Sequence, residues 1–230
     1  MKPRCSKQRN HALTLVEVLA IIATVAILAA MLLPANDGKR KAVIISCANN
    51  LKQAGLAYKV WAGDHNDKYP MDIALTNGGT MELINTTEAW KTFQVMSNEL
   101  ITPKVVFCYG DSSRNICATN FGEDLKNKIS YFIGLNAAGT NATGLLSGDD
   151  NFLLNQVPVK PGLLNVASNA PIEWDTTRHG YSIQRGLFSR KKVGNGNLLL
   201  NDGSLQIATR LNLIQQFNQT GFATNCLAIP

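Results

Sequence analysis

One acidic side chain, Glu17, lies within an otherwise apolar run at residues 12–34. An ionisable group in such a run normally has a partner and a function, yet the run holds no basic residue. If the chain were cut between Ala12 and Leu13, the new amine at Leu13 would lie four residues before Glu17, on the same face of a helix. Glu17 of the same chain or of a neighbouring chain would then neutralise that amine. The second arrangement would fix the register between assembled subunits.

The apolar run predicts a membrane-spanning helix over residues 13–33. At about 1.5 Å rise per residue, a helix of that length crosses the roughly 30 Å hydrocarbon core of a bilayer. A cleaved secretory signal usually has a shorter apolar core of about 7 to 15 residues, so a retained helix is the preferred interpretation. A cytoplasmic N-terminus is predicted from the four basic residues that precede the run, which are Lys2, Arg4, Lys7 and Arg9.

The sequence ALTLVE at residues 12–17 resembles the processing site of type IV prepilins and type II secretion pseudopilins. The resemblance implies that a prepilin peptidase cuts between Ala12 and Leu13 and methylates the new N-terminus at Leu13. It also implies that Glu17, at the fifth mature position, is the assembly residue. The family usually has Gly before the cut and Phe after it, whereas this chain has Ala12 and Leu13. The basic leader, Thr14 and a proline at Pro34 agree with the family pattern.

The chain after the apolar run continues with a helical pattern. Asn36, Asp37 and Gly38 predict a kink or a short break, and a helix over residues 39–62 follows from an apolar stripe with spacings of three and four. This stripe consists of Ile44, Ala48, Leu51, Gly55, Tyr58 and Ala62. The expected organisation is a basic leader (1–12), a transmembrane or filament-core helix (13–33), the second half of the N-terminal helix (34–63) and a periplasmic globular α+β head (64–230).

The head pattern changes from helical to strand-like along the chain. Residues 85–100 begin like a capped helix, and residues 129–206 alternate short β-branched or aromatic runs with Gly, Asn and Pro, which predicts antiparallel strands. Residues 201–203, Asn-Asp-Gly, predict a hairpin turn, and residues 210–219 a last helix. The expected fold class is α+β and pilin-like, with a long N-terminal helix, membrane-spanning in its first half, packed on a small antiparallel β-sheet head.

Further segments, at residues 47–70, 129–132, 146–151 and 196–204, resemble pseudopilin-like proteins of the prepilin-type cleavage and methylation group. Members of that group commonly carry a His shortly before an Asp-Gly turn. Here the nearest is His179, which a basic insertion separates from Asp202. We interpret Asp202 as part of a turn that fixes strand register. The residues Asp149, Asp150 and Asn151 are interpreted as loop caps.

Cys5 belongs to the predicted leader, and the other four cysteines would face an oxidising periplasm. Cys108 and Cys117 enclose a short polar loop, so we predict a disulfide between them and leave Cys47 and Cys226 unassigned. A four-thiolate zinc site is disfavoured because no pair of these cysteines has the two-to-four-residue spacing that such sites favour.

Other chemistry is not predicted. Asp175, His179 and Ser182 are close in sequence but lie in no nucleophile elbow, and the loop around Asp64 and Asp67 lacks the glycine and distal glutamate of an EF-hand. The sequence therefore predicts no catalytic residue, no metal and no cofactor. The formal charge of +6 falls to +2 without the four basic leader residues, so no nucleic-acid partner is predicted.

The sequence thus predicts a non-enzymatic, pseudopilin-like structural subunit of a type II secretion or type IV pilus-like system. Its expected partners are a prepilin peptidase, other pseudopilin or pilin subunits, an inner-membrane assembly platform and the membrane. The expected localisation is the inner membrane, with a single pass, a cytoplasmic N-terminus and a periplasmic head. The alternative is a membrane-anchored module that binds glycans or other extracellular polymers.

Overall fold

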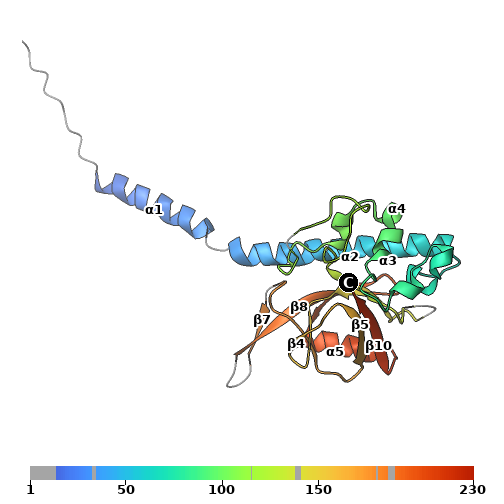
Figure 1. Cartoon of the computed structure of the whole chain (residues 1–230). Helices are drawn as coiled ribbons and strands as arrows, with labels where there is room; N and C mark the ends of the chain where they lie inside the picture. The colour runs from blue at the N-terminus through green and yellow to red at the C-terminus, as the bar shows by residue number, and fades with distance from the viewer. Residues whose placement is uncertain (1–13, 33–34, 115, 138–140, 180, 186–189) are drawn as a thin grey trace, which may run out of the picture. The chain divides into compact units, whose positions relative to one another are not determined.

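The computed structural model describes residues 14–32, 35–114, 116–137, 141–179, 181–185 and 190–230 (Figure 1). The chain divides into two compact units, Met1–Lys39 and Arg40–Pro230. The predicted leader and the predicted cleavage point between Ala12 and Leu13 lie outside the described residues.

The described helices are α1 (Leu15–Leu32), α2 (Ala35–Asp64), α3 (Lys91–Val95), α4 (Ser97–Leu100) and α5 (Arg210–Gln219). Short 3-10 helices are η1 (Pro70–Asp72), η2 (Leu75–Asn77), η3 (Met81–Leu83) and η4 (Pro103–Val106). The strands are β1 (Tyr131–Gly134), β2 (Leu145–Asp149), β3 (Phe152–Leu154), β4 (Val157–Pro158), β5 (Gly162–Ala167), β6 (Ile172–Trp174), β7 (Tyr181–Arg185), β8 (Arg190–Leu200), β9 (Leu205–Thr209) and β10 (Thr224–Ile229).

Helix α1 is shorter than the sequence predicts. Its 18 residues, Leu15–Leu32, rise by about 27 Å, which is less than the roughly 30 Å hydrocarbon core of a bilayer. Within the part of the chain that the structure describes, no helix combines the length and apolar character needed to cross a membrane. The predicted pilin-like fold with a membrane-spanning helix over residues 13–33 is therefore wrong. The same finding contradicts the single-pass inner-membrane localisation with a periplasmic head.

Helix α2 confirms the predicted apolar stripe, because Ala48, Leu51, Tyr58 and Ala62 are buried along one face. Residues 36–38 lie within α2, which begins at Ala35, so the helix is not broken at these positions. Asn and Asp are favourable in the first turn of a helix, where they face unpaired backbone N–H groups and the positive end of the helix dipole. These residue types therefore mark the start of α2 and do not interrupt it.

A seven-stranded antiparallel sheet forms the centre of the unit Arg40–Pro230, in the order β5-β10-β1-β2-β8-β7, with β9 paired to β8. A second sheet of the described chain has the order β4-β3-β6. The predicted antiparallel sheet is thus present. The predicted hairpin is also confirmed, because β8 and β9 pair Leu199 with Leu205 around the turn at residues 201–203.

Alternate residues of the large sheet enter two separate hydrophobic cores, as the two-residue period of a strand requires. On β1, Tyr131 and Ile133 pack in the core that includes α2, whereas Phe132 packs in the core that includes α5. Figure 1 shows α2 and α5 on opposite sides of the sheet. Gly55 allows α2 to approach β8 closely, because a Cβ there would lie 2.9 Å from the methyl groups of Leu199.

The basic insertion after His179 forms a two-stranded extension of the sheet. Strand β7 pairs with the first part of β8, from Tyr181 opposite Gly194 to Arg185 opposite Arg190. Beyond this pairing, β8 continues into the large sheet at Asn195. The backbone of Asn195 interacts with His179. The insertion therefore lengthens the sequence between His179 and the turn at residues 201–203 and leaves His179 beside β8.

Candidate functional site

Charged side chains from three separate segments meet inside the head. We define the charge cluster as Asp111, Arg114, Asp149, Asp150 and Arg178. Asp111 and Arg114 follow η4, Asp149 ends β2 with Asp150 next to it, and Arg178 lies between β6 and β7. All are buried except Arg114, which is partly buried. Charged residues are seldom fully buried unless they are paired, so the pairing within this cluster decides whether the head is stable.

Arg178 is the centre of the charge cluster. Its Nη2 donates to Oδ2 of Asp111 at 2.7 Å and to Oδ1 of Asp150 at 2.6 Å. Its Nη1 donates to the carbonyl oxygen of Ser130 at 2.7 Å and lies 3.6 Å from Oδ1 of Asp149. One guanidinium group therefore neutralises carboxylates from two loops and satisfies a buried carbonyl beside β1.

Arg114 repeats the pairing from the other side. Its Nη1 donates to Oδ2 of Asp111 at 2.7 Å, and its Nη2 donates to Oδ2 of Asp150 at 2.5 Å. Two guanidinium groups thus share the same two carboxylates, a geometry with several charge-assisted hydrogen bonds. The third carboxylate, Asp149, accepts a hydrogen bond from the backbone N–H of Asn197 at 2.6 Å.

The environment separates the acidities of these carboxyl groups. Burial opposes the ionisation of Asp111, but the guanidinium of Arg178, the hydrogen bond from Ser113 and the guanidinium of Arg114 outweigh it and lower the pKa of Asp111 to about 2. Burial raises the pKa of Asp149 above its ordinary value, against the opposing effects of His179 and Arg178. Asp111 is therefore firmly ionised, whereas Asp149 accepts a proton more readily than Asp111 does.

A close backbone approach holds two of the segments together. A Cβ at Gly110 would lie 2.6 Å from the carbonyl oxygen of Arg178 and 3.1 Å from Cδ2 of His179. A larger residue would push the chain that carries Cys108 and Asp111 away from Arg178 and His179. The glycine is required there because contact with the neighbouring backbone leaves no room for a side chain.

A disulfide joins α2 to the loop after η4. It links Cys47 to Cys108, with a Cα–Cα distance of 5.2 Å, which corrects the predicted pairing of Cys108 with Cys117. Asn50 supports the link by donating to the carbonyl oxygens of Lys104 and Phe107 at 3.2 and 3.1 Å. Among the described cysteines, Cys117 and Cys226 have free thiols.

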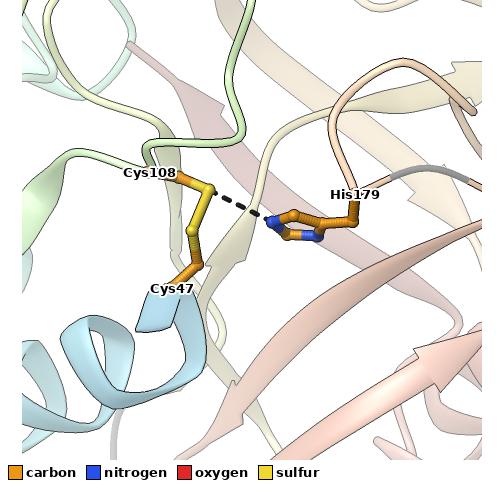
Figure 2. Close-up of side chains that lie close together, drawn as sticks. All are labelled: Cys47, Cys108 and His179. Atoms are coloured by element: carbon orange, nitrogen blue, oxygen red, sulfur yellow. Dashed lines mark hydrogen bonds between the residues drawn. A yellow bond between two sulfur atoms is a disulfide. The ribbon is translucent and has the colours of Figure 1, made fainter. Parts of the chain in front are cut away.

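His179 lies between the disulfide and the charge cluster. Figure 2 shows its imidazole ring facing the two sulfur atoms, with Nε2 at 3.1 Å from Sγ of Cys108. Nδ1 lies 3.5 Å from Oδ2 of Asp149. Burial lowers the pKa of His179, against the opposing effect of the Asp149 carboxylate, so the imidazole is predominantly neutral at neutral pH.

A cavity of about 350 Å³ opens beside the charge cluster. Its polar lining residues include Asp111, Arg114, Asp150, Asp175 and Arg178, and its apolar lining residues include Phe152, Val159 and Ile229. The arginines of this lining already pair with carboxylates, so the free hydrogen-bonding capacity that the cavity offers is limited. The arrangement suits a neutral, partly apolar ligand better than an anion.

His179 is not paired with Asp175, the acidic residue closest to it in the sequence. The carboxylate beside His179 is Asp149, whereas Asp175 accepts a hydrogen bond from the backbone N–H of Thr177 at 3.1 Å. Nε2 of His179 faces a disulfide sulfur, which carries no proton to abstract. His179 is therefore not placed as a general base towards the cavity.

Glu17, the predicted assembly residue, lies in the first turn of α1. Its Oε2 accepts hydrogen bonds from the backbone N–H and the hydroxyl of Thr14, both at 2.8 Å, and its own N–H donates to the Thr14 hydroxyl at 3.3 Å. This reciprocal pattern is a capping box. The Thr14 amide and then the Thr14 hydroxyl lower the pKa of Glu17, so the exposed carboxylate is ionised at neutral pH. The sequence TLVE carries this signal, which sequence reasoning missed.

Sequence reasoning also missed the charge cluster. Asp149 and Asp150 were interpreted as loop caps, and Arg178 and Asp111 carried no local signal because their partners lie in distant segments.

The loop with Asp64 and Asp67 also contains His65, whose ring stacks on the ring of Trp61 with the two centroids 3.6 Å apart.

Comparisons with known proteins assign no family to this chain. No family model matches the sequence, and no curated protein or solved structure is significantly similar to it.

Proposed function

We propose that the chain is a structural subunit of a pilin-like filament, matured by a prepilin peptidase that cuts between Ala12 and Leu13 and methylates Leu13, and assembled through α1. One observation carries the proposal: α1 exposes apolar side chains on all sides, while its first turn presents the ionised carboxylate of Glu17.

The exposed apolar surface of α1 calls for a covering partner. Leu15 is 79% exposed, Ile27 57% and Leu28 62%, although these positions point in different directions around the helix. A helix that is apolar all round is normally buried, and covering each large side chain contributes about 1.5 to 3 kcal/mol. Copies of α1 from other subunits provide such a cover, because each copy needs the same burial.

Glu17 supplies the polar part of that contact. The carboxylate is held by Thr14 at the helix N-terminus, so it is presented at a fixed position. After cleavage, the amine at Leu13 of an adjacent subunit is a cation of matching size. Within an apolar helix bundle an unpaired charge is strongly unfavourable. Every register of the subunits in which the carboxylate and the amine fail to meet is therefore disfavoured.

Maturation is tested by the intact mass of the full chain co-expressed with a prepilin peptidase. We expect a product that begins at methylated Leu13, and no such product from a variant with a bulky residue in place of Ala12. A chain that still begins at Met1 would remove the basis of the proposal.

Assembly is tested by two matched variants that separate the charge of Glu17 from its capping role. Glu17→Gln keeps a capping box, because Gln serves at that position, but loses the charge, whereas Thr14→Ala loses the cap and keeps the charge. We expect filaments, measured by sedimentation and electron microscopy, to be reduced at least about tenfold in Glu17→Gln and largely retained in Thr14→Ala. The reverse order would assign Glu17 a role in helix capping alone.

The cavity beside the charge cluster favours a second candidate function, a binding module for glycans or other polymers. The lining of the cavity includes Phe152, Val159 and Asp175, which provide the apolar and polar surfaces that a sugar needs. A glycan array probed with the full chain tests it: binding that is lost in Asp175→Ala and unchanged in Glu17→Gln would favour the module over the filament.

A further inference from the structure

Three side chains of the head carry metal-ligating atoms within 4.8 Å of one another: Cys47, Cys108 and His179. Figure 2 shows the imidazole ring facing both sulfur atoms. We propose that these three residues bind a zinc ion when the disulfide between Cys47 and Cys108 is reduced. The ion then replaces the disulfide as the link between α2 and the loop after η4.

The distances fit a tetrahedral zinc site after a small adjustment. Zinc bonds of about 2.3 Å to sulfur and about 2.0 Å to nitrogen place the two sulfurs roughly 3.7 Å apart and each sulfur about 3.5 Å from the nitrogen. Nε2 of His179 now lies 3.1 Å from Sγ of Cys108, so that pair must separate by only a few tenths of an ångström. Breaking the S–S bond provides the rest of the space.

The surroundings of His179 match the environment that zinc-bound histidines usually have. Nδ1, the nitrogen that would face away from the ion, lies 3.5 Å from Oδ2 of Asp149. The backbone N–H of Asn197 donates to the same carboxylate oxygen and fixes its position. A carboxylate on the outer nitrogen orients a ligating imidazole and strengthens its bond to the metal.

The proton on the imidazole changes place between the two states. In the oxidised protein a disulfide sulfur can only accept, so Nε2–H donates to Sγ of Cys108. In the zinc state Nε2 carries the metal bond, and the proton resides on Nδ1 towards Asp149. His179 and Asp149 therefore serve both states without moving to new partners.

The chemistry balances with a dithiol as reductant. The dithiol transfers two electrons and two protons to the S–S bond and becomes a disulfide itself, which leaves two cysteine thiols. Zinc then displaces both thiol protons to solvent and binds two thiolates, the imidazole and one water molecule. The divalent ion and two thiolates form a neutral unit, which suits side chains that are 0%, 0% and 3% exposed.

The link that zinc would preserve is an important one. The disulfide closes a loop with a sequence separation of 61, and it is the covalent connection between α2 and the segment that carries Asp111. Because the three ligands come from three separate segments, one ion would hold the same segments together in a reducing environment.

The proposal is tested on the full chain, reduced with a phosphine, unfolded, and refolded without oxygen in the presence of zinc or cobalt(II). Native mass spectrometry counts zinc, and cobalt(II) reports thiolate ligation through its charge-transfer absorption. We expect about one zinc per chain in the reduced protein and none in the oxidised protein that is unfolded and refolded with zinc but without the phosphine.

Variants locate the site. The free cysteines provide matched controls, so Cys117→Ser and Cys226→Ser should bind zinc like the wild type, whereas Cys47→Ser and Cys108→Ser should lose it. Asp149→Asn should weaken zinc binding about 10- to 100-fold while the ion stays bound to the same ligands. Zinc binding that survives in Cys47→Ser, or a reduced wild type that refolds without bound zinc or fails to refold in its presence, would overturn the proposal.

Discussion

Helix α1 and the charge cluster each reverse the usual distribution of side chains. Proteins mostly bury large apolar residues and expose charged ones, yet α1 exposes Leu15, Ile22 and Leu28, and the head buries Asp111, Asp149 and Arg178. The two reversals are resolved differently. The cluster satisfies its charges within the head, whereas α1 by itself leaves its apolar side chains uncovered.

The charge cluster and α1 are therefore expected to contribute to different properties, the cluster to the stability of the head and α1 to contact with a partner. Removing a charge from the cluster leaves buried partners uncompensated, which lowers the stability of the head. If α1 is covered by other subunits, removing an apolar side chain from it should leave the stability of the head unchanged and weaken only that contact. Measurements of unfolding and of assembly should therefore respond to different residues.

The largest effect is expected for Arg178→Ala. The substitution removes the group that pairs with Asp111 and Asp150 and binds the carbonyl oxygen of Ser130, so it leaves buried carboxylates with one guanidinium group fewer. Breaking a buried ion pair in this way costs about 3 to 5 kcal/mol. Urea unfolding followed by the fluorescence of the buried Trp174 measures the change.

Arg210→Ala is the matched control for Arg178→Ala. Arg210 pairs with Glu173 at 2.8 Å, but its side chain is about a third exposed, so the loss should be below about 1 kcal/mol. Arg178→Lys keeps the positive charge but loses the planar guanidinium group. Its loss in the free energy of unfolding should lie between those of the two alanine variants. Equal losses for Arg178→Ala and Arg210→Ala would show that the cluster does not stabilise the head.

A smaller loss of the stability of the head is expected at acidic pH. The pKa of Asp111 is about 2 in the folded protein against an ordinary value of 3.8. Its stabilisation is therefore present in full above pH 3.8 and is lost as the pH falls towards 2. At about 1.4 kcal/mol per pKa unit the contribution is about 2 kcal/mol.

The pH effect is isolated by comparing the wild type with Asp111→Asn. Asp149 contributes a change in stability with pH of the opposite sign, because burial raises its pKa. This contribution is present in both proteins and cancels in the comparison. The difference between their unfolding free energies should shrink by about 2 kcal/mol between pH 5 and pH 2. A constant difference across that range would mean that the charge of Asp111 contributes nothing.

The sequence predicted those elements whose signals are local. The stripe on α2, the hairpin between β8 and β9, and the helix at residues 210–219 follow from periodicity and turn residues, and the structure contains all three. The length of α1 was overestimated because hydropathy marks apolar residues and does not mark where a helix begins and ends.

The charge cluster and the disulfide depend on pairings between distant segments. Asp111 comes from the segment after η4, Asp150 from the end of β2 and Arg178 from the segment before β7, so only the folded chain brings them together. Cys108 was assigned to Cys117 because the two are close in sequence, but Cys47 lies nearer in space once α2 packs on the sheet. No local pattern encodes such contacts, since they follow from strand register and from the packing of α2 on the sheet.

The smallest effect on stability is expected for Ile22→Ala in α1. The side chain is 59% exposed, so in dilute protein without partners the unfolding free energy of the head should change by less than about 0.5 kcal/mol. Leu199→Ala, which empties a buried position against α2, should cost about 2 to 5 kcal/mol in the same assay. If Ile22 is covered only by other subunits, its truncation should lower filament yield while leaving the unfolding curve in place. A loss of head stability in Ile22→Ala would instead mean that α1 finds its cover within its own chain, and the contrast between the two regions would disappear.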